Sequence, residues 1–238
     1  MTVCLFDLDG VLTQTAKVHA AAWKQMFDSY LQQRAKRDGE EFRAFEQDDY
    51  DEYVDGKPRA DGVRSFLESR QIKLPEGSEE DPASAETIAG LGNRKNELVL
   101  KLIAEQGVEP YEGSVRYVHA VRDAGVPRAV VSSSTNCRAV LAAAGIDDLF
   151  DTIIDGVVAE REHLAGKPAP DTYQAGARAL GVEPAAAVVF EDAVAGVASG
   201  RAGKFGYVVG VDRVDHAEAL REHGADVVVE DLAELLER

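Results

Sequence analysis

Short apolar runs alternate with amphipathic stretches along most of this chain. Runs rich in Val, Ile, Ala and Phe are too short for helices and predict buried strands at 3–6, 127–132, 152–154, 186–190, 207–211 and 226–229. Apolar residues at helical spacing predict helices at 16–30, 63–70, 93–106, 115–124, 137–144, 171–180 and 193–202. Residues 74–87 are rich in Pro, Ser and Glu, a composition that favours an exposed loop.

The order of these elements predicts the fold class. In the second half of the chain strands alternate with helices, which is typical of a parallel sheet covered by helices on both faces. The first strand is apolar throughout, as expected for a strand of that same sheet. We therefore predict an α/β protein with a Rossmann-like core of residues 1–14 and 108–238, interrupted by an α-helical domain of residues 15–107.

Composition narrows the range of partners. The net charge of −17 and the pI near 4.7 argue against binding to nucleic acid or to anionic membrane surfaces. The longest apolar runs are shorter than a membrane span requires. Cys4 and Cys137 lack a neighbouring cysteine or histidine at metal-ligand spacing, so we expect two free thiols in a cytoplasmic protein.

Polar residues follow three of the predicted strands at the point where each strand ends. Ligands bind beyond the carboxyl ends of the strands in an open parallel sheet, so these residues are candidates for one site. The candidates are Asp7 and Asp9 after the first strand, Ser132–Asn136 after the second, Glu191 and Asp192 after the fourth, and Lys167 in a loop. Carboxylates, hydroxyls and a lysine in one place suit phosphate chemistry with a hard metal ion.

Each of these features also has an ordinary structural interpretation. Asp9 and Gly10 could form a simple turn, the Ser and Asn residues of 132–136 could cap a helix, and Lys167 could be a solvated surface charge. All of them, however, occur at strand ends in one consistent order. Their joint occurrence favours a functional site.

Four segments carry a resemblance to a known family. Residues 6–12 (FDLDGVL), 130–136 (VVSSSTN), 166–171 (GKPAPD) and 189–196 (VFEDAVAG) resemble motifs of the haloacid dehalogenase superfamily of phosphatases and phosphomutases. The resemblance implies that Asp7 is the nucleophile and Asp9 the acid/base, that Ser132 holds the phosphoryl group, and that Lys167 steadies the reacting oxygens. It also implies a Mg²⁺ site made by Asp7, Asp9, Glu191 and Asp192.

The inserted helical domain resembles the cap of the sugar phosphomutases of that superfamily. Residues 7–23 match them closely, and the matching positions imply a set of substrate contacts: Gly10, Thr15, His19, Trp23, Arg59, Lys95, Ser133, Ser134 and Asn136. The implied reaction interconverts β-glucose 1-phosphate and glucose 6-phosphate through an aspartyl-phosphate enzyme and a sugar 1,6-bisphosphate. We expect a monomer whose partner is a small sugar phosphate.

Some residues depart from that pattern and leave other functions open. Gln14 stands where an aspartate is usual, Thr135 replaces a lysine, and residues 74–92 are expected to form a longer loop than in those mutases. One alternative is a Mg²⁺-dependent phosphatase of a small sugar or polyol phosphate, with the same core chemistry. A non-enzymatic phospho-acceptor module would also carry acids after its first strand, but such modules are shorter and lack a helical insertion there.

Overall fold

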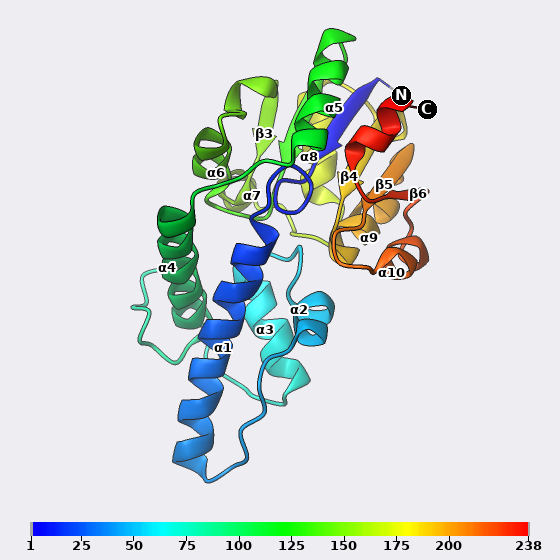
Figure 1. Ribbon diagram of the computed structural model, residues 1–238. Coiled ribbons are helices and arrows are strands. Elements are labelled where there is room, and N and C mark those ends of the chain that lie inside the picture. The colour runs from blue at the N-terminus through cyan, green and yellow to red at the C-terminus, as the bar shows by residue number, and fades with distance from the viewer. Residues whose placement is uncertain (1, 238) are drawn as a thin grey trace. The chain divides into compact units, whose positions relative to one another are not determined.

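The computed structural model describes residues 2–237, which divide into two compact units (Figure 1). The sheet unit consists of Met1–Thr15, Gly56–Pro58 and Val108–Arg238, and the helical unit of Ala16–Asp55 and Arg59–Gly107. None of the helices in the described part of the chain has the length and apolar character needed to cross a membrane.

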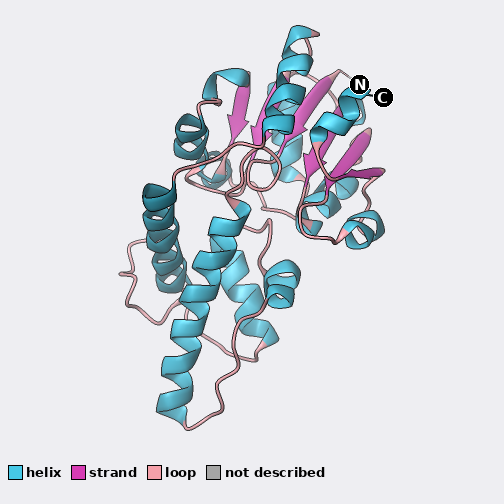
Figure 2. Cartoon of the chain, in the orientation of Figure 1, coloured by secondary structure: helices cyan, strands magenta, loops and turns pink. Residues whose placement is uncertain are grey.

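The sheet unit contains six parallel strands in the order β3-β2-β1-β4-β5-β6 (Figure 2). The strands are β1 (Val3–Phe6), β2 (Arg128–Val131), β3 (Thr152–Ile154), β4 (Ala187–Glu191), β5 (Tyr207–Val211) and β6 (Val227–Val229). The first strand lies in the middle, where Leu5 pairs with Ala129 on one side and with Val189 on the other. The central position buries β1 completely, which explains its uninterrupted apolar sequence.

Helices cover both faces of this sheet. They are α5 (Glu112–Asp123), α6 (Cys137–Ala144), α7 (Gly156–Glu162), α8 (Asp171–Ala179), α9 (Val194–Ala202) and α10 (Ala217–Glu222), with short 3-10 turns at Asp147–Leu149, Pro184–Ala186 and Leu232–Glu237. Leu5 packs with Tyr173 of α8 on one face. Its neighbour Phe6 points to the other face, where its ring lies 6.3 Å from that of Tyr117 in α5.

The helical unit has its own aromatic core. Its helices are α1 (Ala16–Asp38), α2 (Gln47–Tyr53), α3 (Arg59–Ser69) and α4 (Ile88–Gln106). The ring of Phe27 in α1 lies 5.3 Å from Trp23, 5.0 Å from Phe45 and 4.2 Å from Phe66 of α3. Apolar residues of all four helices join this cluster, so the helical unit has a hydrophobic core of its own.

The fold class predicted from the sequence is confirmed, whereas several helix boundaries were wrong. Helix α1 continues to Asp38, beyond the predicted end at residue 30. Its last turns are polar and solvated and carry little apolar periodicity, so the sequence pattern did not reveal them. Helix α4 begins at Ile88, inside the predicted 74–92 loop, because the Thr87 hydroxyl accepts a hydrogen bond from the Gly90 N–H. The short helices α2, α7 and α10 were not predicted, since six or seven residues show too little periodicity.

The aromatic core makes a prediction about stability. Phe27 is fully buried, so we expect Phe27→Ala to lower the free energy of unfolding of the helical unit by about 3–5 kcal/mol. Trp23 is the only tryptophan of the chain, so its fluorescence during urea unfolding reports on this unit. Phe42→Ala is the control, because Phe42 is 40% exposed and should contribute little; equal losses for both variants would contradict the prediction.

Candidate active site

The carboxyl ends of three adjacent strands bring the predicted catalytic residues together. Asp7 follows β1, Ser132 follows β2, and Glu191 and Asp192 end and follow β4. The strand ladders continue through two of these positions, since the Asp7 N–H donates to the Phe190 carbonyl at 2.9 Å and the Ser132 N–H to the Ile154 carbonyl at 2.9 Å. These backbone hydrogen bonds therefore fix the positions of the Asp7 and Ser132 Cα atoms at the edge of the sheet.

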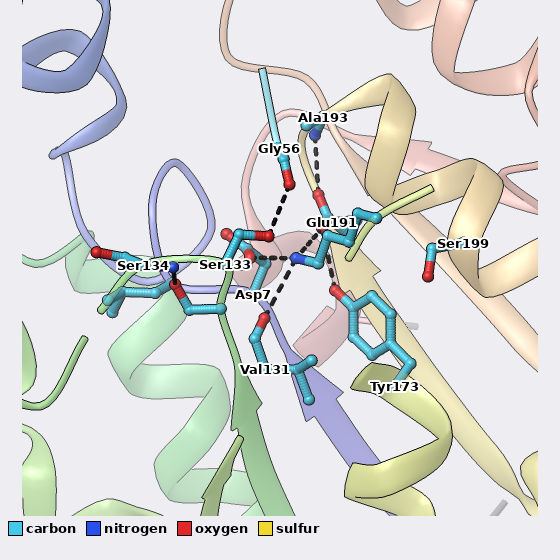
Figure 3. A network of polar contacts seen from close by, with 12 residues as sticks. Asp7, Gly56, Val131, Ser133, Ser134, Tyr173, Glu191, Ala193 and Ser199 are labelled. Carbon is cyan, nitrogen blue, oxygen red and sulfur yellow. Dashed lines mark hydrogen bonds and ion pairs between the residues drawn. The ribbon is translucent and has the colours of Figure 1, made fainter. Parts of the chain in front are cut away.

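Lys167 lies at the centre of this group of side chains. Its ammonium Nζ donates to Asp7 Oδ1 at 2.5 Å, to Glu191 Oε1 at 2.5 Å and to the Val131 carbonyl at 3.2 Å. The three acceptor residues are labelled in Figure 3. The same nitrogen lies 4.9 Å from the ring centroid of Tyr173. Lys167 is only 2% exposed, so a single buried cation joins the ends of all three strands.

Burial and neighbouring charges have opposite effects on the pKa values of Asp7 and Lys167. Burial raises the pKa of Asp7 above its ordinary value, the Lys167 ammonium opposes that shift, and the carboxylates of Glu191 and Asp9 add to it. Burial alone would lower the pKa of Lys167, but the carboxylates of Asp7 and Glu191 outweigh it and raise that pKa. The two buried carboxylates therefore favour the charged form of Lys167, and Lys167 in turn favours the charged form of Asp7.

The loop after β1 brings Asp9 close to the same place. Gly10 has a φ of +90°, and a Cβ atom there would collide with the Asp192 carboxylate. The Thr15 hydroxyl donates to Asp9 Oδ1, and it lies 2.7 Å from the Thr13 hydroxyl. Thr15 therefore fixes the orientation of the Asp9 carboxyl group.

The Ser132–Asn136 segment forms a compact turn before α6. The Ser132 Oγ accepts a hydrogen bond from the Ser134 N–H at 3.1 Å, and the Ser134 Oγ accepts one from the Asn136 N–H at 3.1 Å. The Ser133 hydroxyl donates to the Gly56 carbonyl at 2.8 Å (Figure 3). Three hydroxyls thus lie in one turn at the carboxyl end of β2.

Three of the residues predicted in the helical unit also form a cluster. The Lys95 ammonium lies 3.0 Å from His19 Nδ1 and 4.9 Å from the ring centroid of Trp23. Lys95 is buried, with 6% exposure, so it is not a solvated surface charge. Arg59, at the start of α3, is half-buried, and a Cβ atom added to Gly92 of α4 would lie 3.3 Å from its Cγ atom.

The donor set fits a hard divalent cation. Ligand oxygens of Asp7, Glu191 and Asp192 all lie within 4.8 Å of one another, and all three residues are buried. Carboxylate oxygens grouped at this spacing are the ligands that hard divalent cations prefer in proteins. Glu191 also accepts hydrogen bonds from the Tyr173 hydroxyl at 3.1 Å and from the Ala193 N–H at 3.0 Å, which hold its carboxylate in place.

Tyr173 is a residue of this site that the sequence did not reveal. Its hydroxyl donates to Glu191, and its fully buried ring lies beside the Lys167 ammonium. Burial and the nearby carboxylates raise the pKa of Tyr173 far above its ordinary value, so it remains a hydrogen-bond donor. Helical spacing indicates that Tyr173 is buried, but its partner lies on a strand that only the fold brings near.

Comparison with known proteins agrees with this geometry. The family of haloacid dehalogenase-like hydrolases matches residues 1–204. The chain belongs to this family. A β-phosphoglucomutase of Mycobacterium bovis is 58% identical over 237 residues, covering 98% of this chain and 90% of that protein.

Two further relatives of this haloacid dehalogenase-like hydrolase differ from each other in the activity that they are named for, one a mutase and the other a phosphatase. A β-phosphoglucomutase of Clostridium difficile has a crystal structure that aligns with a TM-score of 0.77 and 26% identity, covering 99% of this chain and 93% of that one. A validoxylamine A 7'-phosphate phosphatase of Streptomyces hygroscopicus is 31% identical over 98% of this chain and 95% of its own length. The predicted resemblance to the superfamily and to its sugar phosphomutases is confirmed.

The contact between Gly10 and Asp192 makes a prediction for this haloacid dehalogenase-like hydrolase. We expect Gly10→Ala to abolish phosphoryl transfer, because the methyl group displaces the Asp192 carboxylate. The left-handed backbone adds about 1–2 kcal/mol of strain. Gly39→Ala is the matched control, since Gly39 has a φ of +70° but no atom within 4 Å of an added Cβ. Steady-state kinetics should show a loss only for Gly10→Ala, and normal kinetics for that variant would refute the role of the contact.

Proposed function

We propose that this protein is a phosphomutase that interconverts β-glucose 1-phosphate and glucose 6-phosphate through an aspartyl-phosphate enzyme and a sugar 1,6-bisphosphate. The observation that carries the proposal is the buried Lys167 held between Asp7 and Glu191 at the ends of the central strands. Such a cation lets a carboxylate approach a phosphate dianion. The full-length similarity to a protein named β-phosphoglucomutase supports the choice of substrate.

Asp7 is the proposed nucleophile. One of its carboxylate oxygens attacks the phosphorus atom at C1 of the 1,6-bisphosphate, the bond from that phosphorus to the C1 oxygen breaks, and an aspartyl phosphate forms as glucose 6-phosphate leaves. The positive charge of Lys167 stabilises both the Asp7 carboxylate and the negative charge of the phosphoryl oxygens. The Ser132 hydroxyl, 2% exposed at the end of β2, contributes a hydrogen bond to one of those oxygens.

Asp9 is the proposed acid and base. It donates a proton to the departing sugar oxygen and later accepts one from the sugar hydroxyl that attacks the aspartyl phosphate. Thr15 holds its carboxyl group through a hydrogen bond, so the proton is delivered from a fixed direction. A metal ion, for which we propose Mg²⁺, supplies additional positive charge to the phosphoryl group when bound. Its proposed ligands are the side chains of Asp7 and Asp192 and the Asp9 carbonyl, with Glu191 beside them.

The remaining predicted residues are assigned to the sugar phosphate. In this proposal Arg59 grips the phosphate that does not react, and Lys95, oriented by His19 and Trp23, binds sugar hydroxyls. Gly10, Ser133, Ser134 and Asn136 contact the substrate from the sheet unit. We propose that the helical insertion serves as a cap that excludes water, because a mutase must pass its phosphoryl group to a sugar hydroxyl instead.

Hydrolysis of a small sugar or polyol phosphate is the second candidate. It is favoured by the similarity to a validoxylamine A 7'-phosphate phosphatase, and it needs the same Asp7, Asp9 and Lys167. Thr135 stands at a position where the sugar phosphomutases carry a lysine, so this chain has one cation fewer to bind the second phosphate of a sugar bisphosphate. The two candidates differ in whether water or a sugar hydroxyl accepts the phosphoryl group.

The metal site predicts a change in stability. Because Mg²⁺ binds the native state, we expect it to raise the melting temperature over that in EDTA, by about 2–4 °C for each kcal/mol of binding free energy. Asp192→Asn should lose most of this shift. Asp147→Asn, an exposed carboxylate of the sheet unit, should keep the shift of the wild type. Calorimetry that shows equal shifts for both variants would place the metal elsewhere.

Phosphorus NMR tests the reaction itself. With Mg²⁺, β-glucose 1-phosphate and a trace of glucose 1,6-bisphosphate, we expect the substrate signal to be replaced by that of glucose 6-phosphate. Asp7→Asn keeps the size of the side chain but removes the nucleophilic charge, so it should give no conversion. Accumulation of inorganic phosphate in place of glucose 6-phosphate would select the phosphatase.

A further inference from the structure

The loop after β5 contacts the loop after β1, which is the active-site loop. Arg213 follows β5, and its side chain is 13% exposed. Its Nε donates to the Gly10 carbonyl at 2.9 Å, and a second nitrogen donates to the Ser114 hydroxyl at 3.3 Å. Ser114 in turn donates to the Val11 carbonyl at 2.7 Å. Two successive carbonyls of the active-site loop are therefore held by one connected pair of side chains.

The guanidinium itself is held firmly. It donates to the Glu230 carbonyl at 2.6 Å, pairs with Asp231 at 3.2 Å, and stacks with its central carbon 3.6 Å from the ring centroid of Tyr111. The Tyr111 N–H donates to the Leu12 carbonyl, so this ring is anchored to the same loop. A planar guanidinium with several fixed partners sets a position more sharply than a flexible ammonium can.

The same loop also contacts the backbone of Asp192. His216 Nε2 lies 2.9 Å from the Asp192 carbonyl, and Asp212 accepts hydrogen bonds from the N–H groups of Val214, His216 and Ala217. Gly10 packs directly against the Asp192 carboxylate. A shift of the Gly10 peptide would therefore displace Asp192 and the neighbouring Asp9 carbonyl together.

We propose that Arg213 is a positioning residue for the active site, which fixes the Asp9–Val11 backbone and through it the proposed metal ligands. This proposal rests on the proposed phosphoryl-transfer function and metal site. Arg213 acts through the Gly10 carbonyl, and its partners Ser114 and Tyr111 hold the carbonyls of the next two residues, Val11 and Leu12.

The test compares two arginines of similar burial in the sheet unit. Arg128, 10% exposed, likewise donates to two carbonyls, those of Leu149 and Val126, and pairs with an aspartate, but it lies at the amino end of β2. The measurements are kcat and KM for β-glucose 1-phosphate, and Mn²⁺ affinity from the electron paramagnetic resonance signal of the unbound ion. Thermal unfolding of each variant is recorded alongside.

We expect Arg213→Met to lose about 10- to 100-fold in kcat and in Mn²⁺ affinity, with little change in KM. Millimolar guanidinium should restore part of both, and Arg213→Lys should fall between the wild type and Arg213→Met. Arg128→Met should lose stability while its kcat and Mn²⁺ affinity stay at the wild-type values. Arg213→Met that is destabilised like Arg128→Met, yet retains kcat and Mn²⁺ affinity, would overturn the proposal.

Ser114→Ala keeps the test decisive if Arg213→Met does not fold. It removes only the hydroxyl between Arg213 and the Val11 carbonyl, so we expect a smaller loss in the same two quantities, and wild-type values would refute the positioning role. A wild-type enzyme without mutase activity would refute the proposed function alone. The effect of Arg213 would then still be read from Mn²⁺ affinity.

Discussion

A single ammonium group buried among carboxylates is the interaction on which the rest of this site depends. Lys167 and Glu191 are almost inaccessible to water, and Asp7 is only slightly more exposed. Buried charges of one sign would repel each other at short range, and each would be costly without a partner. Lys167 satisfies two carboxylates from two strands together with the Val131 carbonyl of a third, so the carboxyl edge of the sheet is held together by charge.

The close spacing of three buried carboxylates is what suits the site to a divalent cation: ligand oxygens of Asp7, Glu191 and Asp192 lie within 4.8 Å of one another. Burial favours the protonated form of Asp7, whereas the Lys167 ammonium favours the ionised form that the proposed attack requires. The acidic surface of the whole chain gives no help in attracting a phosphate, so the attraction must be local.

Each of the two units has a core of its own and carries part of the proposed site. The sheet unit has its core between β1, β2 and β4 and the helices on either face, and it carries the residues proposed for the chemistry. The helical unit has a separate aromatic core, and it carries the His19, Trp23 and Lys95 cluster proposed for the sugar. Separate cores allow the residues assigned to the substrate to vary among relatives without disturbing the phosphoryl-transfer residues. This is consistent with the different substrates named for members of the family.

The sequence by itself determined the alternation of strands and helices, and with it the edge of the sheet where Asp7, Ser132 and Asp192 meet. Strand ends are local features, and in a parallel sheet they all fall on the same side, so no long-range information was needed to group them. The helix boundaries were harder to predict from the sequence, because polar turns such as the end of α1 and short helices such as α7 carry little apolar periodicity.

Only the tertiary structure decided how each side chain is held. Lys167 lies in a loop far from Asp7 in the sequence, and its place between Asp7 and Glu191 follows from how that loop folds over the strand ends. Tyr173 and Arg213 were absent from the predicted site. The residues around a tyrosine on a helix, or around an arginine after a strand, do not show which distant residue its side chain will contact. Their contacts with Glu191 and Gly10 join segments that are distant in the chain, and such contacts are set by packing of the whole fold.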